Sequence, residues 1–220
     1  PSSAASDVYK RQEEIIRGDI AIQDGIIAGI GSFHGKEERD LAGRYVCPGF
    51  IDSHLHLEST LVTPAELVTA ASRHGTTTFI VDPHESANVS GLAGIDYILD
   101  QTEDVKANVY VMMPSCVPAT AIDDNGCTLT AEDMAPYLHN SRILGLGEVM
   151  DSISVVQGEK SMHDKLELFE GRIRDGHAPF LEEGDLQAYA MAGIATDHEC
   201  SFFDYAMRER RNGLTILVRE

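Results

Sequence analysis

The chain has 220 residues, of which 43% are hydrophobic and 24% charged, and a formal net charge of −19 at pH 7. This length suits one domain with its own core, or one domain and part of another, and the composition is that of a folded protein. The negative charge repels nucleic-acid phosphates and anionic lipids, so we expect neither nucleic acid nor a membrane as a partner. No apolar run approaches the ~18 residues of a membrane span and no signal-peptide pattern occurs, so we expect a cytoplasmic protein.

The first 46 residues differ in pattern from the rest. Residues 1–12 have no periodicity and include a run, Ser6 to Gln12, that resembles a translated sequencing adapter, so we expect a non-native or disordered leader. Between Gly18 and Gly31, apolar residues alternate on either side of Asp24-Gly25, which predicts a β-hairpin. Because a hairpin cannot bury its apolar face alone, residues 13–46 are predicted to be part of a small β domain.

From residue 47 onward, short apolar runs alternate with segments of helical length. The runs are Phe50–Ile51, Thr76–Val81, Val109–Met113, Ile143–Leu146, Arg172–Asp175, Gly193–Thr196 and Leu214–Val218. This repeat predicts an α/β fold in which a parallel sheet is connected by right-handed crossovers.

Three helices have recognisable boundaries. Thr63 to Glu66 is a capping box with proline at the first helical position, and that helix should end at His74-Gly75. The segment Ser201–Asn212 has the same character. A third helix opens at Thr130, but Pro136 falls about one turn inside it and should kink the helix or move its start.

The four cysteines are Cys47, Cys116, Cys127 and Cys200, and they form no C-x-x-C pair. This spacing argues against a disulfide framework and against a thiolate zinc clip. We expect reduced thiols that mostly pack.

Polar clusters follow the carboxyl ends of five of the apolar runs. They are Asp52 to Glu58, Asp82 to Glu85, Gly147-Glu148, Asp175 to His177 and Asp197 to Glu199. In an α/β barrel, side chains from separate strands converge at that edge, which is where sites form. We therefore expect these residues to share one site.

The residue types in these clusters suit divalent metal ions. Residues two apart in a strand point the same way, so His54 and His56 can reach one ion together. An isolated H-x-H pair is weak evidence, but Glu148, His177 and His198 each end a strand of their own. Four imidazoles and one carboxylate can hold two ions with Glu148 as the bridge, and iron, manganese and zinc all fit these ligands.

Other residues at the strand ends are open to two interpretations. His84 and Glu85 can contact substrate or a further metal, or only cap the following turn. Glu58 lies on the same predicted strand face as His54 and His56, either beside the ligands or as a buried helix-cap partner. Glu199 adjoins His198 but faces away from it if the backbone is extended.

Two divalent cations lower the pKa of a bridging water toward neutrality, which favours hydrolysis. The sequence has no G-x-S-x-G elbow, no phosphate-binding glycine loop and no dinucleotide fingerprint. From the residues alone, the prediction is a metal-dependent hydrolase of a carbon–nitrogen bond or an ester.

Several long motifs resemble a known family. Pro48 to His56 is similar to the first barrel strand of the amidohydrolase superfamily. The segments that resemble the adenine deaminase family within it are Thr76–Glu85, Pro114–Thr120, Leu144–Met150, Asp175–Pro179 and Thr196–Cys200. The resemblance runs from about residue 15 to the end of the chain.

The resemblance implies a (β/α)8 TIM-type barrel, incomplete here with about seven strands over residues 47–220, and a small β-sandwich domain to which residues 13–46 contribute. It implies hydrolytic deamination of a purine base, adenine, to hypoxanthine and ammonia. Two divalent ions, manganese or iron with zinc as the alternative, would be held by His54 and His56 on one side and by His177 and His198 on the other, with Glu148 between them. The full-length form is expected to be a homo-oligomer.

The same resemblance leaves the acid that assists the reaction open. An acid at the barrel mouth must protonate a ring nitrogen, and the candidates are His84, Glu85 and Ser115, with Ser115 and Glu58 expected at the substrate. The aspartate that ends the eighth strand in relatives would lie beyond Glu220, so we expect this length of chain alone to be inactive. The alternatives are another amidohydrolase, such as a cyclic-amide hydrolase or a deacetylase, and a non-catalytic binding module.

Overall fold

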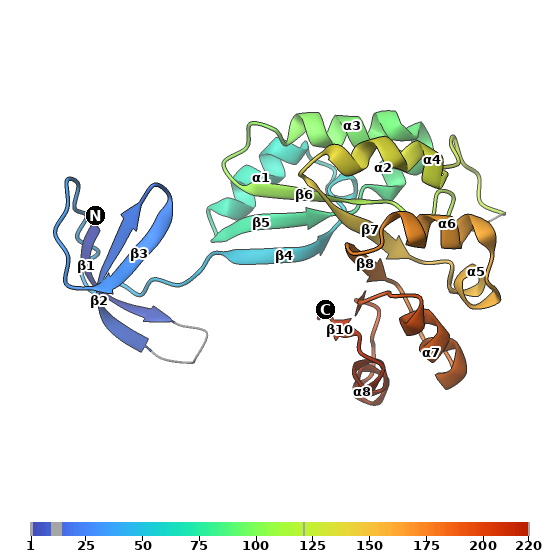
Figure 1. Cartoon of the computed structure of the whole chain (residues 1–220). Helices are drawn as coiled ribbons and strands as arrows, with labels where there is room; N and C mark the ends of the chain where they lie inside the picture. The colour runs from blue at the N-terminus through green and yellow to red at the C-terminus, as the bar shows by residue number, and fades with distance from the viewer. Residues whose placement is uncertain (1, 10–14, 121, 220) are drawn as a thin grey trace. The chain divides into compact units, whose positions relative to one another are not determined.

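The computed structural model describes residues 2–9, 15–120 and 122–219, which form two compact units, residues 1–49 and 50–220 (Figure 1). The first unit is an antiparallel sheet of β1 (Ser2–Tyr9), β2 (Ile15–Gln23) and β3 (Ile26–Gly31), in that order. The hairpin predicted around Asp24-Gly25 is confirmed. Both turn residues have positive φ, 52° and 77°, which is the conformation that a two-residue hairpin turn needs.

The leader expected over residues 1–12 differs in the structure. Ser2–Tyr9 form β1 and pair with β2, with Val8 opposite Ile16. Pairing through main-chain groups needs no side-chain periodicity, so the sequence pattern did not reveal this strand. Residues 10–12 lie outside the described part of the chain.

The second unit contains a five-stranded parallel sheet in the order β4-β5-β6-β7-β8 (Figure 1). The strands are β4 (Phe50–Leu55), β5 (Thr76–Val81), β6 (Asn108–Met113), β7 (Ile143–Val149) and β8 (Ile173–Gly176). Two further strands, β9 (Thr196–Asp197) and β10 (Thr215–Ile216), pair in parallel with each other. A hydrogen bond from the Ala195 main-chain nitrogen to the Arg174 carbonyl, 3.0 Å, places β9 next to β8. The seven predicted strands are therefore all found, five in one parallel sheet and two in a separate parallel pair.

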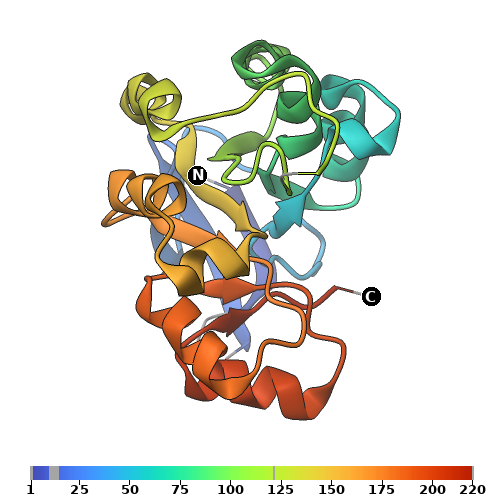
Figure 2. The same cartoon turned by 90° about the vertical axis from the view of Figure 1, so that its right-hand side faces the viewer.

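Helical segments connect these strands, and the helices pack around the sheet (Figures 1 and 2). They are η1 (Glu58–Thr60), α1 (Pro64–Ser72), α2 (His84–Ser90), α3 (Leu92–Gln101), α4 (Ala131–Met134), η2 (Ala135–His139), α5 (Ser152–Gln157), α6 (Lys160–Leu168), α7 (Glu183–Met191) and α8 (Phe203–Arg211). No helix in the described ranges is both long enough and apolar enough to cross a bilayer.

The predicted helix signals act as expected. The Thr63 hydroxyl accepts a hydrogen bond from the Glu66 main-chain nitrogen, with Pro64 at the first position of α1. Thr130 and Asp133 form a capping box at the start of α4. The α-helix then ends at Met134 and continues as the 3-10 helix η2, because Pro136 lacks the N–H that an α-helix requires.

The core of the second unit lies between the strands and the helices that cover them. Its fully buried members include Phe79 and Val81 of β5, Met113 of β6 and Ile95 and Ile98 of α3. This packing holds the strands in register, so the carboxyl ends of β4 to β8 lie along one edge of the sheet. That edge carries the predicted site residues.

Replacing Phe79 with alanine should lower the free energy of unfolding by about 3–5 kcal/mol, because the ring is 1% exposed and its loss leaves a cavity. The matched control is Phe203→Ala, since Phe203 is 78% exposed and its truncation should cost about 0.5 kcal/mol or less. Urea denaturation followed by circular dichroism measures both. Equal losses in the two variants would contradict the described core.

Candidate metal centre

Five histidines surround the carboxylate of Glu148, which lies near the end of β7 with only 3% of its surface exposed. The nitrogens nearest to Oε1 are His56 Nε2 at 3.0 Å, His84 Nε2 at 3.2 Å and His54 Nε2 at 3.6 Å, and those nearest to Oε2 are His177 Nδ1 at 2.7 Å and His198 Nε2 at 3.2 Å. The five metal ligands predicted from sequence are therefore brought together, and His84 joins them.

Two groups of potential ligands share Glu148: one is His54, His56 and Glu148, and the other is Glu148, His177 and His198. A third group, His54, Asp175 and His198, overlaps both, and within each group the ligand atoms lie within 4.8 Å of one another. Glu148 Oε1 is buried and makes no hydrogen bond of good geometry, although three imidazoles lie close to it. A cation satisfies such an oxygen and the nitrogens around it, so these residues fit the metal ions that the sequence predicts.

Two aspartates that the sequence analysis did not single out orient the first pair of histidines. Asp175 Oδ2 lies 3.0 Å from His54 Nδ1, and the Asp82 main-chain carbonyl lies 2.8 Å from His56 Nδ1. With each Nδ1 donating outward, each Nε2 presents its lone pair to the centre, as a metal ligand must. The signal in the sequence was that both aspartates end a strand within polar clusters.

The Asp82 side chain also fixes the main chain of Glu148. Asp82 Oδ2 accepts a hydrogen bond of 2.7 Å from the Glu148 main-chain nitrogen. This close approach depends on Gly147, because a Cβ at that position would lie 2.2 Å from Asp82 Oδ2. The glycine before the central glutamate is thus required by packing.

Tyr189 of α7 connects the ends of β7 and β8. Its fully buried hydroxyl accepts a hydrogen bond of 3.0 Å from the His177 main-chain nitrogen and donates one of 2.6 Å to the Val149 carbonyl. No polar motif surrounds Tyr189 in the sequence, so the sequence did not indicate that its hydroxyl joins the ends of β7 and β8.

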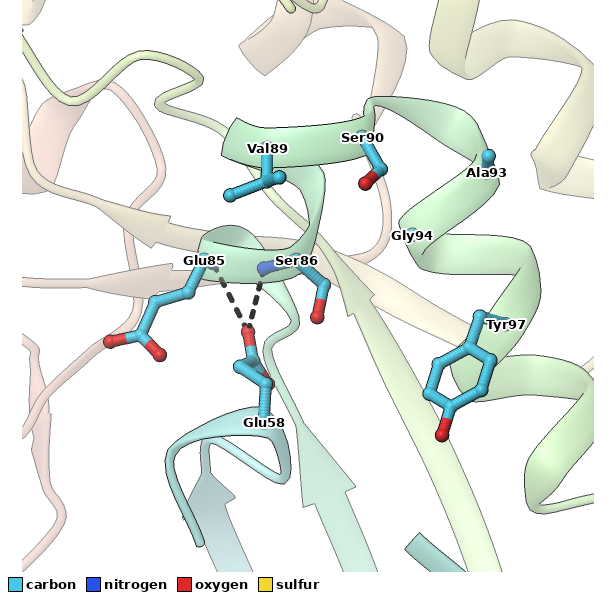
Figure 3. Close-up of a pocket in the computed structure, with 8 residues that line it drawn as sticks. All are labelled: Glu58, Glu85, Ser86, Val89, Ser90, Ala93, Gly94 and Tyr97. Carbon is cyan, nitrogen blue, oxygen red and sulfur yellow. Dashed lines mark hydrogen bonds between the residues drawn. The ribbon is translucent and has the colours of Figure 1, made fainter. Parts of the chain in front are cut away.

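The structure corrects the expected position of Glu58. Strand β4 ends at Leu55 and Glu58 begins η1, so the predicted shared strand face with His54 and His56 is wrong. Figure 3 shows its carboxylate below the first turn of α2, where Oε1 accepts from the main-chain nitrogens of Glu85, 3.1 Å, and Ser86, 3.3 Å. Of the two interpretations, the helix-cap contact is the one observed.

Glu85 and Ser115 do not contact the Glu148 carboxylate. The exposed Glu85 side chain extends away from α3 in Figure 3 and accepts a hydrogen bond of 2.6 Å from the Ser59 hydroxyl. It nevertheless lines, together with His84, a cavity of about 410 Å³. Ser115 is buried, and its hydroxyl donates to the Glu148 main-chain carbonyl at 2.5 Å.

Glu199 also differs from expectation. An extended backbone would turn it away from His198, but Glu199 Oε1 lies 3.7 Å from His198 Nε2 and pairs with Arg219. The chain leaves β9 at Asp197, where the Glu199 main-chain nitrogen bonds to Asp197 Oδ2, so the two-residue alternation of a strand no longer applies.

The contacts at the centre shift the ionisation of its members. Burial alone would raise the pKa of Glu148, but the close imidazoles of His177, His198, His56 and His84 hold it far below its usual range. Burial lowers the pKa of His56, but its contacts with Glu148 and the Asp82 carbonyl outweigh this and raise it to about 9. Burial and the nearby Glu148 charge raise the pKa of Asp82 to about 8.

Substituting Gly147 with alanine should destabilise the protein by about 1–3 kcal/mol and weaken metal binding, because the new methyl group displaces Asp82 from the Glu148 main chain. Gly184→Ala is the matched control, since a Cβ there meets no atom within 4 Å. Thermal unfolding and metal content report the two effects. Wild-type values for Gly147→Ala would contradict the described contact.

The stability of the chelator-treated protein should fall as the pH rises from about 6.5 to about 9. The raised pKa of His56 contributes stability that is complete below 6.5 and is lost as the pH passes 9. The raised pKa of Asp82 acts in the same direction up to about pH 8, because below that pH the folded state keeps a proton that the unfolded chain has already lost. Melting temperatures across this range measure the slope.

The His56→Asn variant should show a shallower slope than the wild type, whereas His34→Asn should not, because the His34 side chain is 93% exposed. A metal-free wild type that becomes more stable between pH 6.5 and 9 would contradict the described contacts of His56 and Asp82.

Comparison with known proteins agrees with this geometry. The sequence pattern of the Amidohydrolase family matches residues 45–216. The chain is 59% identical over 208 residues to an adenine deaminase of Desulfitobacterium hafniense (strain Y51) and 48% identical over 209 residues to one of Clostridium acetobutylicum. Each alignment covers 94% of this chain and 37% of the relative, so the chain spans little more than a third of those proteins.

A solved structure supports the fold. The crystal structure of 5-methylcytosine deaminase from Klebsiella pneumoniae aligns with 97% of this chain and 64% of its own, with a TM-score of 0.55 and 16% identity. The likeness confirms the predicted α/β barrel class, of which the five-stranded sheet is an incomplete part. Because the family pattern covers most of its length, the chain belongs to the amidohydrolase family.

Proposed function

We propose that the protein containing this chain catalyses the hydrolytic deamination of adenine to hypoxanthine and ammonia. The observation that carries the proposal is the buried Glu148 carboxylate at the centre of five imidazoles. The identity to proteins named adenine deaminase narrows the substrate to a purine base. Since the chain spans 37% of those relatives, the activity is proposed for the whole protein.

The proposed ligands are those predicted from the sequence. His54 and His56 serve one divalent ion, His177 and His198 serve a second, and Glu148 lies between them. Imidazole and carboxylate ligands suit manganese or iron, with zinc as the alternative. When bound, such ions supply hydroxide at neutral pH.

The remaining residues position these ligands and move protons. Asp175 and Asp82 hold His54 and His56 in the tautomer that binds metal. We assign the acid that assists the reaction to His84, whose Nε2 lies 3.2 Å from Glu148 Oε1 and which belongs to neither of the two ligand groups that share Glu148. A proton held at its ring can pass to a purine ring nitrogen, which makes the carbon that carries the amine electrophilic.

Three further residues lie close to the ligands or to His84. They are Glu85, Glu58 and Ser115. Glu85 lines the same cavity as His84 and is placed at the substrate or as a second proton donor. Glu58 caps the first turn of α2, the helix that begins at His84, so it holds that ring in place. Ser115 acts through the Glu148 carbonyl that it binds.

Ammonia release by the whole protein tests the proposal, with adenine, adenosine monophosphate, a cyclic amide and an N-acetylated sugar as substrates. Adenine should be the best substrate and the nucleotide a poor one, because Arg142 and Arg172 are bound to main-chain carbonyls. Glu148→Gln should lower bound metal and reduce the rate by ~100-fold or more, since hydroxide supply and proton transfer both depend on this centre.

His34→Asn is the control and should keep the wild-type rate, because this histidine is exposed and belongs to the other unit. Faster turnover of the cyclic amide or the sugar would assign a different amidohydrolase activity. No turnover of any substrate by metal-loaded protein would leave a binding module as the explanation.

A further inference from the structure

A second group of potential metal ligands lies apart from the histidine centre. Asp197 ends β9, Cys200 follows in the loop and Glu209 lies in α8, and their ligand atoms are all within 4.8 Å of one another. Strand β10 pairs with β9 and contacts α8 at the carboxyl-terminal end of the chain, which is red in Figure 2. Asp197 and Glu209 are both 0% exposed.

The two carboxylates of this group have no direct ion-pair partner among the described residues. Arg208, the neighbour of Glu209 in α8, stacks over the Tyr205 ring at 4.9 Å instead. Two buried carboxylates without a counter-charge are costly, so either a proton or a cation must lie between them.

The atoms of the group are arranged to receive a cation. Glu209 Oε1 is buried and has no hydrogen-bond partner. Hydrogen bonds from the main-chain nitrogens of Ala178, 2.6 Å, and Glu199, 2.9 Å, orient the Asp197 carboxylate. The Cys200 sulfur contacts both carboxylates.

We propose that Asp197, Cys200 and Glu209 form a second metal site that binds one zinc-class divalent cation through two carboxylates and a thiolate. Tetrahedral zinc, with bonds of about 2.3 Å to sulfur and about 2.0 Å to oxygen, places those atoms about 3.5 Å apart. The observed distance from Cys200 Sγ to Asp197 Oδ2 is 3.3 Å. On binding, the Cys200 thiol releases its proton to solvent and its sulfur bonds to the metal, with no change of oxidation state.

A cation at this site would help to fix the position of His198 in the histidine centre. A cation held by Asp197 and Glu209 ties β9 to α8, and His198 directly follows Asp197 in the chain. The sequence lacks a C-x-x-C clip, and the fold instead brings one cysteine together with carboxylates three and nine residues away, a mixed donor set of oxygen and sulfur. The proposal is independent of the substrate proposed above.

Cobalt titration of the chelator-treated protein tests the site. Thiolate bound to Co²⁺ gives a charge-transfer absorption in the near ultraviolet, and the histidine centre has only nitrogen and oxygen ligands. The band should reach one equivalent per chain in the wild type and in Glu148→Gln. It should fall at least tenfold in Cys200→Ser and in Glu209→Gln, and persist in the matched control Cys127→Ser.

Alkylation provides a second readout that needs no variant. Added Zn²⁺ should slow the reaction of Cys200 with iodoacetamide at least tenfold, while the exposed Cys47 reacts at an unchanged rate. Absence of the cobalt band in folded wild type, or a band that persists in Cys200→Ser, would overturn the proposal. So would equal alkylation of Cys200 with and without Zn²⁺, which would leave a shared proton between the carboxylates as the explanation.

Discussion

The second unit depends on keeping one buried carboxylate ionised. Glu148 lies among five imidazoles, and its contacts with four of them outweigh the unfavourable burial of its charge. The main-chain groups on either side of its side chain are also bound, the nitrogen by Asp82 and the carbonyl by Ser115. The strands are therefore arranged around a charge that would be costly without its partners.

The parallel sheet allows the histidines to surround Glu148, because the polar residues that end each strand lie at the same edge. β4 brings His54, β5 leads to His84, β7 brings Glu148 and β8 leads to His177. In addition, an aspartate and a main-chain carbonyl at the strand ends bind the outward nitrogens of His54 and His56. The polarity of the centre is thus directed inward, and the apolar core remains separate from it.

Much of this could be predicted from the sequence, because the signals were local. The Asp24-Gly25 turn, the effect of Pro136 and the convergence of histidines at strand ends depend on short segments. The positions of Glu58 and Glu199 could not be predicted, because the chain leaves the strand geometry just before each of them. The roles of Asp82 and Tyr189 depend on contacts between residues distant in sequence, which a pattern of residue types does not encode.

The hydroxyl of Tyr189 links the outer layer of the fold to the inner one. It bonds to the main chain at Val149 and at His177, and so fixes the separation of two strand ends from a helix outside the sheet. Helix α7 therefore acts as a spacer for residues that it does not touch through their side chains. The consequence is that the outer layer is not free to drift in sequence as surface helices usually are, because a shift of α7 by a fraction of an ångström would change the distance between His177 and its carboxylate partner.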